Sequence, residues 1–224
     1  MKLLFLIGTL FLTTAWFSPK NSPSSPLTFP PAIPVVTDEK SKGSILPAGR
    51  GFISYPVFEG IETKETVNQV VLNFVDQLEG TYSSYNTHLK ANYVIMHYGT
   101  RLASVLFTGQ VDGVRGIQPF RSTLNINMEN GSRLQLNDLV LLDGDFIDIV
   151  YKQLKSKLQS RKGDITTLFP TGIEDIINQA DYHMDSPIHS YFTPYEIGLI
   201  FKVPEEFGSY ITVIVPNKFQ EVFE

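Results

Sequence analysis

The stretch 188-IHSYFTPYEIGLIFKVPEEFGSYITVIVPNKF-219 has the strongest β-strand pattern in the chain. Apolar residues recur at period two between residues 197 and 203, a Pro- and Gly-containing interruption follows at 204–208, and the alternation resumes at 210–215. This pattern predicts a β-hairpin. Because both faces of the returning strand are apolar, we expect it to be covered on both sides and to lie inside a sheet.

The composition limits the classes of protein to which the chain can belong. The 224 residues carry a net charge of -5, and no basic run is longer than Arg161-Lys162. A nucleic-acid partner is therefore not expected. The chain has no cysteine, which excludes disulfides and thiolate metal sites. The length fits one compact domain or two small subdomains, 48–110 and 111–224.

The N-terminal residues predict export. Residues 1–17 contain one basic residue, Lys2, and then an apolar run of about fifteen residues, which is shorter than the roughly 20 needed to span a membrane. We interpret this segment as a signal peptide, with cleavage after Ala15, or as an uncleaved N-terminal anchor that would be the only membrane contact. Residues 18–47 are rich in Pro and Ser and predict an extended spacer before an extracytoplasmic region, 48–224.

The middle of the chain predicts an α+β fold. Apolar residues at helical spacing indicate one helix at 62–79, closed by Gly80, and a second at 145–161. Short β patterns indicate an edge strand at 52–57 that ends at Pro56, and a hairpin between 82–98 and 102–111. We expect an antiparallel sheet with both helices packed on one side of it, because the helices and strands do not alternate strictly.

The turn at Glu129-Asn130-Gly131 allows an expectation about strand register. A two-residue loop would place Leu134 opposite Asn127, mixing polar and apolar groups on one face. A three-residue loop with Gly131 in the left-handed conformation would place Leu134 opposite Ile126 and Leu136 opposite Leu124. We predict the three-residue loop.

Several local motifs, taken in order, resemble a known family. They are Tyr55-Pro56 with Gly60 and Asn68; Asn125-Ile126-Asn127, Gly131, Leu134, Leu136 and Asp138-Leu139; and Phe192-Thr193, Gly198-Leu199-Ile200, Glu206, Tyr210 and Val215-Pro216. Residues 51–220 resemble the extracytoplasmic region shared by RsiV-type anti-sigma factors and by the N-terminal part of PdaC-type peptidoglycan deacetylases. The chain departs from that family at Gly113-Val114-Arg115-Gly116, where the family commonly has Gly-Ala-His, so no role of that histidine is carried over.

The resemblance implies a sensor or accessory region. The sequence shows neither a sigma-binding segment nor a deacetylase domain. In RsiV-type proteins the region recognises lysozyme, so an extracellular protein such as lysozyme, or a peptidoglycan glycan, is the implied partner. We therefore expect an exported, non-enzymatic binding module at the bacterial cell envelope, without a cofactor.

One cluster, Asp181-x-His183-x-Asp185-x-x-x-His189, has the residue types of a metal site. In an extended segment residues 181, 183 and 185 would project to one face and present carboxylate and imidazole groups to a zinc or manganese ion. A polar connection before the last strands explains the same residues. If His183, Asp185 and His189 were ligands, the protein would be a metal-assisted wall hydrolase, which is the alternative function.

No pattern in the sequence predicts catalytic residues, because there is neither a nucleophile elbow nor a cysteine. Tyrosines offer both contact area and a hydrogen bond, so an aromatic group between residues 82 and 98 predicts either a binding face or cross-strand packing. The candidate ligand-binding residues are Tyr82, Tyr85, Tyr93, Arg115, Glu206 and Tyr210. A purely structural envelope component that self-associates is the third hypothesis.

Overall fold

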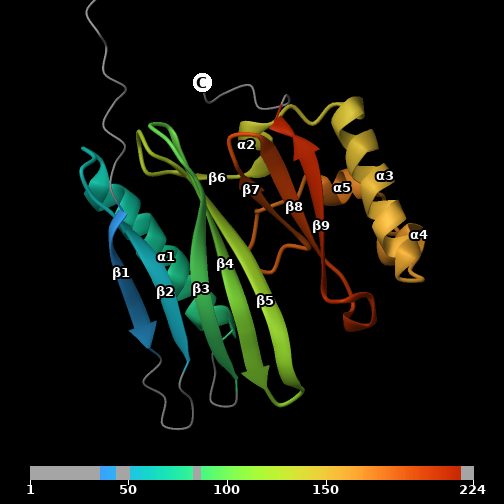
Figure 1. The fold of residues 1–224 in the computed structure, drawn as a ribbon, viewed down its shortest axis with the longest axis horizontal. Coiled ribbons are helices and arrows are strands. Elements are labelled where there is room, and N and C mark those ends of the chain that lie inside the picture. The colour runs from blue at the N-terminus through green and yellow to red at the C-terminus, as the bar shows by residue number, and fades with distance from the viewer. Residues whose placement is uncertain (1–35, 44–50, 83–86, 218–224) are drawn as a thin grey trace, which may run out of the picture. The chain divides into compact units, whose positions relative to one another are not determined.

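The computed structural model describes residues 36–43, 51–82 and 87–217, and of 36–43 only the backbone. The chain forms an α+β fold, as the sequence predicts, but with two sheets in place of one (Figure 1). Both sheets belong to the same compact unit. The expected signal peptide or anchor, 1–17, lies outside the described residues. Among those described, no helix is long and apolar enough to cross a membrane.

The larger sheet has six strands in the order β1-β2-β3-β4-β5-β6. Their bounds are β1 Val36–Gly43, β2 Phe52–Phe58, β3 His88–Tyr98, β4 Leu102–Gly113, β5 Gly116–Asn127 and β6 Arg133–Leu134. All neighbours pair antiparallel except β2 and β3, which are parallel. β1 lies within the expected spacer, and the boundary considered between residues 110 and 111 falls inside β4.

β2 is not an edge strand, so that expectation is wrong. It lies between β1 and β3, and Pro56 is within it, opposite Glu39 of β1. Only Phe52 and Ile53 of β2 pair with β3. Pro56 lies beyond that short parallel pairing, so on the β3 side its missing N–H interrupts no ladder bond.

The helix α1, Lys64–Tyr82, covers one face of the larger sheet (Figure 1). Its buried residues, Val67, Val71, Phe74, Val75 and Leu78, have the spacing predicted for one helical face. The helix does not end at Gly80 as expected but continues to Tyr82. Contacts of Tyr82 hold this last turn, since its ring packs edge-on against Phe120 and its hydroxyl donates a hydrogen bond to the carbonyl of Met184.

The turn before β6 confirms the left-handed conformation predicted for Gly131 but contradicts the predicted strand register. Gly131 has a positive φ of 74°, and a Cβ built there would meet the Thr66 side chain at 2.5 Å. However, Leu134 pairs with Asn125 and not with Ile126, one residue away from the predicted register. Asn127 pairs its backbone with Ser132, and Leu136 has already left the strand to begin α2, Leu136–Leu139, where it is buried. The Leu136 side chain thus reaches the core from α2 and not from a strand.

The smaller sheet is built by the C-terminal stretch, with β7 Ile188–Phe192, β8 Glu196–Lys202 and β9 Tyr210–Pro216 in that order. The predicted hairpin of β8 and β9 is confirmed, and the short helix η1, Glu205–Phe207, occupies its loop. The expectation that β9 lies inside a sheet is wrong, because β8 is the central strand and β9 is at the edge. Ile211, Val213 and Val215 are buried, whereas the residues between them are only half-buried.

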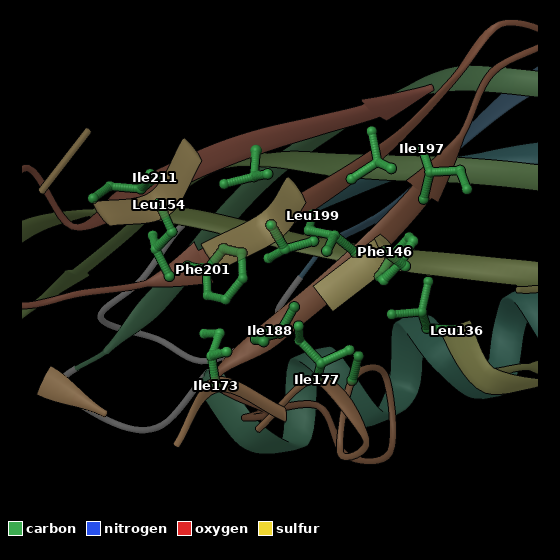
Figure 2. Packing of buried hydrophobic residues seen from close by; sticks show 14 of the residues in the cluster. Leu136, Phe146, Leu154, Ile173, Ile177, Ile188, Ile197, Leu199, Phe201 and Ile211 are labelled. Atoms are coloured by element: carbon green, nitrogen blue, oxygen red, sulfur yellow. The ribbon is translucent and has the colours of Figure 1, made fainter. Parts of the chain in front are cut away.

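Three helices cover one face of the smaller sheet: α3 Gly144–Ser160, α4 Ile165–Leu168 and α5 Ile173–Ile177. Asp143 caps α3 by accepting a hydrogen bond from the backbone of Phe146 at 2.8 Å. Figure 2 shows the resulting core, in which apolar side chains of α3 and α5 gather against those of the three strands. The predicted helix at 145–161 is therefore present, but α1 and α3 pack on different sheets.

Polar side chains of α3 close the free edge of β9. The Gln153 amide donates to the carbonyl of Ile214 at 2.6 Å and accepts from its N–H at 3.3 Å. Lys157 donates to the carbonyl of Thr212 at 2.8 Å, and Arg161 donates to that of Tyr210 at 3.3 Å. Residues 153 and 157 are four apart and lie on one face of α3, and Arg161 is the residue that caps the C-terminus of the helix. That face takes the place of a fourth strand at an edge that would otherwise be open to pairing.

Candidate functional site

The candidate site is a pocket formed by the irregular segment 178–187, which connects α5 to β7. The pocket has a volume of about 490 Å³, within the size range of small-molecule sites. Most of its lining side chains are polar or aromatic: Asn178, Gln179, Tyr182, His183, Asp185, Ser186 and Pro187. Tyr182 is 60% exposed, and the neighbouring His183 ring stands edge-on to it at 4.5 Å between centroids.

Hydrogen bonds inside the segment fix its shape. The buried Ser186 hydroxyl donates to the carbonyl of Gln179 at 3.1 Å and accepts from the backbone N–H of His183 at 3.0 Å. Asp181 has a left-handed backbone, with φ at 62°, which Asp tolerates better than most residues because its side chain bonds locally. The pocket is therefore built on a segment with a defined conformation.

Two side chains from the larger sheet and its helix hold the segment from outside. The Arg133 guanidinium donates to the carbonyl of Asp181 at 3.0 Å, and the Tyr82 hydroxyl donates to that of Met184 at 3.2 Å. Burial raises the pKa of Tyr82 to about 12, with the nearby Tyr210 and Asp185 adding to the shift. Tyr82 therefore stays a hydrogen-bond donor throughout the physiological range.

Beneath the pocket lies a group of buried polar residues that we call the polar seam. It joins β4 and β5 of the larger sheet to β7 of the smaller one. Each of its side chains is between 0% and 3% exposed, and they are Ser104, Thr123, Asn125, Asp181, His189 and Ser190. Buried polar groups are tolerated only when they are hydrogen-bonded, so their partners decide whether the seam stabilises the fold.

The Asp181 carboxylate is the centre of the polar seam. It accepts hydrogen bonds from the Thr123 hydroxyl at 3.0 Å, from the backbone N–H of Ser190 at 2.8 Å, and from the Ser190 hydroxyl. Burial lowers the pKa of Arg133, and the negative charge of Asp181 opposes that shift. The buried carboxylate is thus satisfied by three donors and has a guanidinium nearby.

The polar seam also closes the free edge of β7. Asn125 donates to the carbonyl of Ser190 at 3.0 Å, and Ser104 accepts from the backbone N–H of Phe192 at 3.0 Å. Ser104 in turn donates to the Asn125 side chain at 2.7 Å. The backbone N–H of Asp181 bonds the carbonyl of Ile188 at 3.2 Å. The outward backbone groups of β7 therefore find partners on the larger sheet and on the segment 178–187.

Three residues of the polar seam have the types found in a catalytic triad. The Nδ1 atom of His189 lies 3.8 Å from the Asp181 carboxylate, and Ser190 bonds the same carboxylate directly. The arrangement differs from a triad, in which the histidine stands between the serine and the acid. All three side chains are buried, so a substrate has no path to the hydroxyl. We interpret the cluster as structural, because it joins β7 of the smaller sheet to the larger sheet.

The proposed metal ligands do not come together. The segment is a series of turns and not an extended strand, so residues 181, 183 and 185 do not share a face. His183 and Asp185 are exposed at the pocket, whereas His189 is buried beside Asp181. In the described part of the chain, no group of three or more His, Asp or Glu side chains is arranged to hold a metal ion.

The candidate ligand-binding residues are dispersed over the fold. Tyr82 and Tyr210 lie close to each other, and Tyr82 is next to the pocket segment. The Tyr210 hydroxyl accepts a hydrogen bond from the backbone of Arg121 at 3.3 Å, and the Arg121 guanidinium lies 5.7 Å from its ring centre. Tyr93 packs against the core under α1.

The other three candidates lie elsewhere. Arg115 is exposed at the tip of the hairpin between β4 and β5, and Glu206 is exposed in η1. Tyr85 is outside the described residues. The sequence reasoning missed Tyr182 as a pocket residue and Ser104, Asn125 and Ser190 as parts of the polar seam. One signal was available for Ser104 and Asn125, since each lies directly between two apolar residues of its strand.

No family model matches the sequence, and no curated protein matches it. Two solved bacterial structures are similar in fold. A DUF3298 family protein from Pseudomonas aeruginosa PAO1 is 12% identical, with a TM-score of 0.48 over 80% of this chain and 89% of that one. A DUF3298 family member from Bacteroides fragilis is 13% identical, with a TM-score of 0.46 over 83% and 91%. These values support no functional argument, and the resemblance to RsiV-type and PdaC-type proteins stays a prediction.

Proposed function

We propose that the protein is an exported, non-enzymatic binding module of the bacterial cell envelope, and that the pocket of segment 178–187 is its ligand site. The observation that supports this most is the contrast between the buried residues of the polar seam and the exposed residues that line the pocket. The cluster of Ser190, His189 and Asp181 is buried in the polar seam, whereas the exposed pocket presents a phenol ring, an imidazole, amides and a carboxylate, and the hydroxyl of its Ser186 is already bonded within the segment. Such a lining suits recognition of a ligand.

The pre-formed shape of the pocket supports the same proposal. Ser186, Tyr82 and Arg133 hold the segment at several points along its length. A site whose conformation is fixed before binding loses less conformational entropy when the ligand arrives. The ligand that we propose is a wall glycan or an extracellular protein such as lysozyme, as the resemblance of residues 51–220 implies.

Binding is tested with the full chain, peptidoglycan fragments and lysozyme in isothermal titration calorimetry. We expect at least one of the two to bind with a Kd in the micromolar range or below, and the fragments to be recovered unchanged after prolonged incubation. If neither ligand binds, the proposed ligand is wrong. If the fragments are cleaved, the protein is an enzyme and the non-enzymatic assignment is wrong.

Export is tested separately in a bacterium that produces the full chain. The protein should be found outside the cytoplasm, either cleaved after Ala15 or retained on the outer face of the membrane through residues 1–17. N-terminal sequencing distinguishes these two forms. A protein recovered entirely from the cytoplasm with Met1 in place would contradict the proposed location.

A further inference from the structure

We infer that the pocket of segment 178–187 binds an uncharged pyranose unit of a glycan, with one face of the sugar ring against Tyr182. This inference rests on the proposed binding function and names the chemical class of its ligand. It follows from three features of the pocket: an exposed and oriented aromatic ring, uncharged hydrogen-bonding groups around it, and the sign of the charge in its lining.

Tyr182 provides the platform. A pyranose has one face made largely of C–H groups, which packs on an aromatic ring, while the rim of the ring carries hydroxyls. The Tyr182 ring is 60% exposed, and the His183 ring stands at 88° to it. A perpendicular neighbour covers at most one face of the tyrosine ring, so at least one face stays available for packing, and the contact restricts the orientation of the ring. The phenol oxygen adds a hydrogen-bonding group at the edge of the platform.

The polar groups around Tyr182 can form hydrogen bonds with the hydroxyls at the rim of a sugar ring. Each hydroxyl both donates and accepts, so a site for sugars needs both kinds of partner. Asn178 and Gln179 are exposed and supply amide donors and acceptors, and the exposed Asp185 carboxylate supplies acceptors. Ser186 does not serve this purpose, because its hydroxyl already bonds within the segment.

The charge of the lining selects against anionic sugars. Asp185 is negative, and the described lining residues include no Lys or Arg. The chain as a whole carries a net charge of -5, which also repels anionic polymers. A phosphorylated or carboxylated sugar would therefore bring its negative charge to the pocket of the Asp185 carboxylate, with no Lys or Arg in the described lining to offset the repulsion. An uncharged pyranose is not repelled in this way.

The test uses the full chain and three soluble probes in titration calorimetry: chitotriose and cellotriose, which are uncharged, and trigalacturonate, which is anionic. At least one uncharged probe should bind, and trigalacturonate should bind about tenfold more weakly or not at all. Tyr182→Ala should weaken binding by about tenfold or more, whereas Tyr182→Phe, which keeps the platform, should stay within about threefold.

The matched control is Tyr195→Ala, which removes another tyrosine, 82% exposed, that does not line the pocket. It should leave binding unchanged, and melting temperatures should show that all three variants fold. The inference is overturned if trigalacturonate binds best, or if Tyr182→Ala binds the uncharged probes as well as the parent does. Binding of lysozyme without any of the sugars would overturn the inference and leave the proposed function standing. Failure of every sugar, of the peptidoglycan fragments and of lysozyme would overturn both.

Discussion

The two edges of the smaller sheet are closed in opposite ways. At β7 the unpaired backbone groups meet Asp181, Asn125 and Ser104, which are buried between the two sheets. At β9 they meet Gln153, Lys157 and Arg161, which reach across from α3 and are half-buried or exposed. Both arrangements remove an open strand edge, which is a template for aggregation.

The two edges differ in whether water can replace a lost hydrogen-bond partner. If a partner at β9 is lost, solvent can hydrogen-bond the freed backbone group, so the cost is small. If a partner at β7 is lost, the freed group is buried without a partner and its full desolvation penalty remains. The comparison therefore predicts that equivalent substitutions at the two edges differ several-fold in their effect on stability.

The largest effect is expected for Asp181→Ala. This substitution leaves the Ser190 N–H and the Thr123 hydroxyl without their acceptor, and it leaves the Arg133 guanidinium without its neighbouring charge. The carboxylate accepts from three buried donors, and a buried donor left without a partner costs about 1 to 3 kcal/mol, so the loss should be about 3 kcal/mol or more. Urea denaturation should show a loss of this size, and Asp148→Ala, an exposed control on α3, should change the unfolding free energy by less than about 0.5 kcal/mol. Equal losses would contradict the role given to Asp181.

A smaller effect is expected for Asn125→Ala. The variant keeps Asp181 but leaves the Ser190 carbonyl without a donor and the Ser104 hydroxyl without its acceptor. One unsatisfied buried group costs about 1 to 3 kcal/mol. Asn92→Ala on β3 is the control, because Asn92 is an exposed asparagine on the same sheet. If the two variants unfold at the same urea concentration, the edge of β7 does not depend on Asn125.

At the other edge, Gln153→Ala should cost about 0.5 to 1.5 kcal/mol, the net value of an ordinary hydrogen bond. Water replaces part of the lost bonding, since Gln153 is only half-buried. Gln159→Ala, on the same helix and exposed, controls for the change in helix propensity. A Gln153→Ala loss as large as that of Asp181→Ala would show that the two edges are energetically alike.

The last effect concerns Tyr82 and is visible only in alkali. Its pKa is raised from 10.0 to about 12, so the unfolded chain loses the phenol proton first as the pH rises. The contribution of Tyr82 to stability is complete below pH 10 and is lost between about pH 10 and 12. The parent should therefore lose more stability than Tyr82→Phe over this interval in urea titrations. Parallel curves for the two proteins would contradict the raised pKa.

The sequence predicts local features of the fold better than the pairing of distant segments. The hairpin of β8 and β9, the helices α1 and α3, and the left-handed Gly131 all follow from short-range patterns. Periodicity shows which residues face a core, but it does not show which strand lies alongside. For this reason β9 was expected inside a sheet and β2 at an edge, and the reverse is found.

The candidate site was harder to predict for the same reason. The polar seam joins Ser104, Asn125, Asp181 and Ser190, which are separated by many residues along the chain. The metal hypothesis required an extended segment at 181–185, whereas Asp181 and Ser186 fold this part of the chain into turns through bonds to their own neighbours and to Ser190. Only the three-dimensional arrangement shows that His189 turns inward and Tyr182 outward.

Native-state hydrogen exchange of single backbone amides tests the comparison of the two edges most directly. The amides of Ser190 and Phe192 donate into the polar seam, and that of Ile214 donates to Gln153 at the other edge. We predict that the first two exchange only through global unfolding, with the free energy measured in urea. The Ile214 amide should exchange through local opening, at a lower free energy. Equal protection at the two edges, or stronger protection of Ile214, would contradict the account.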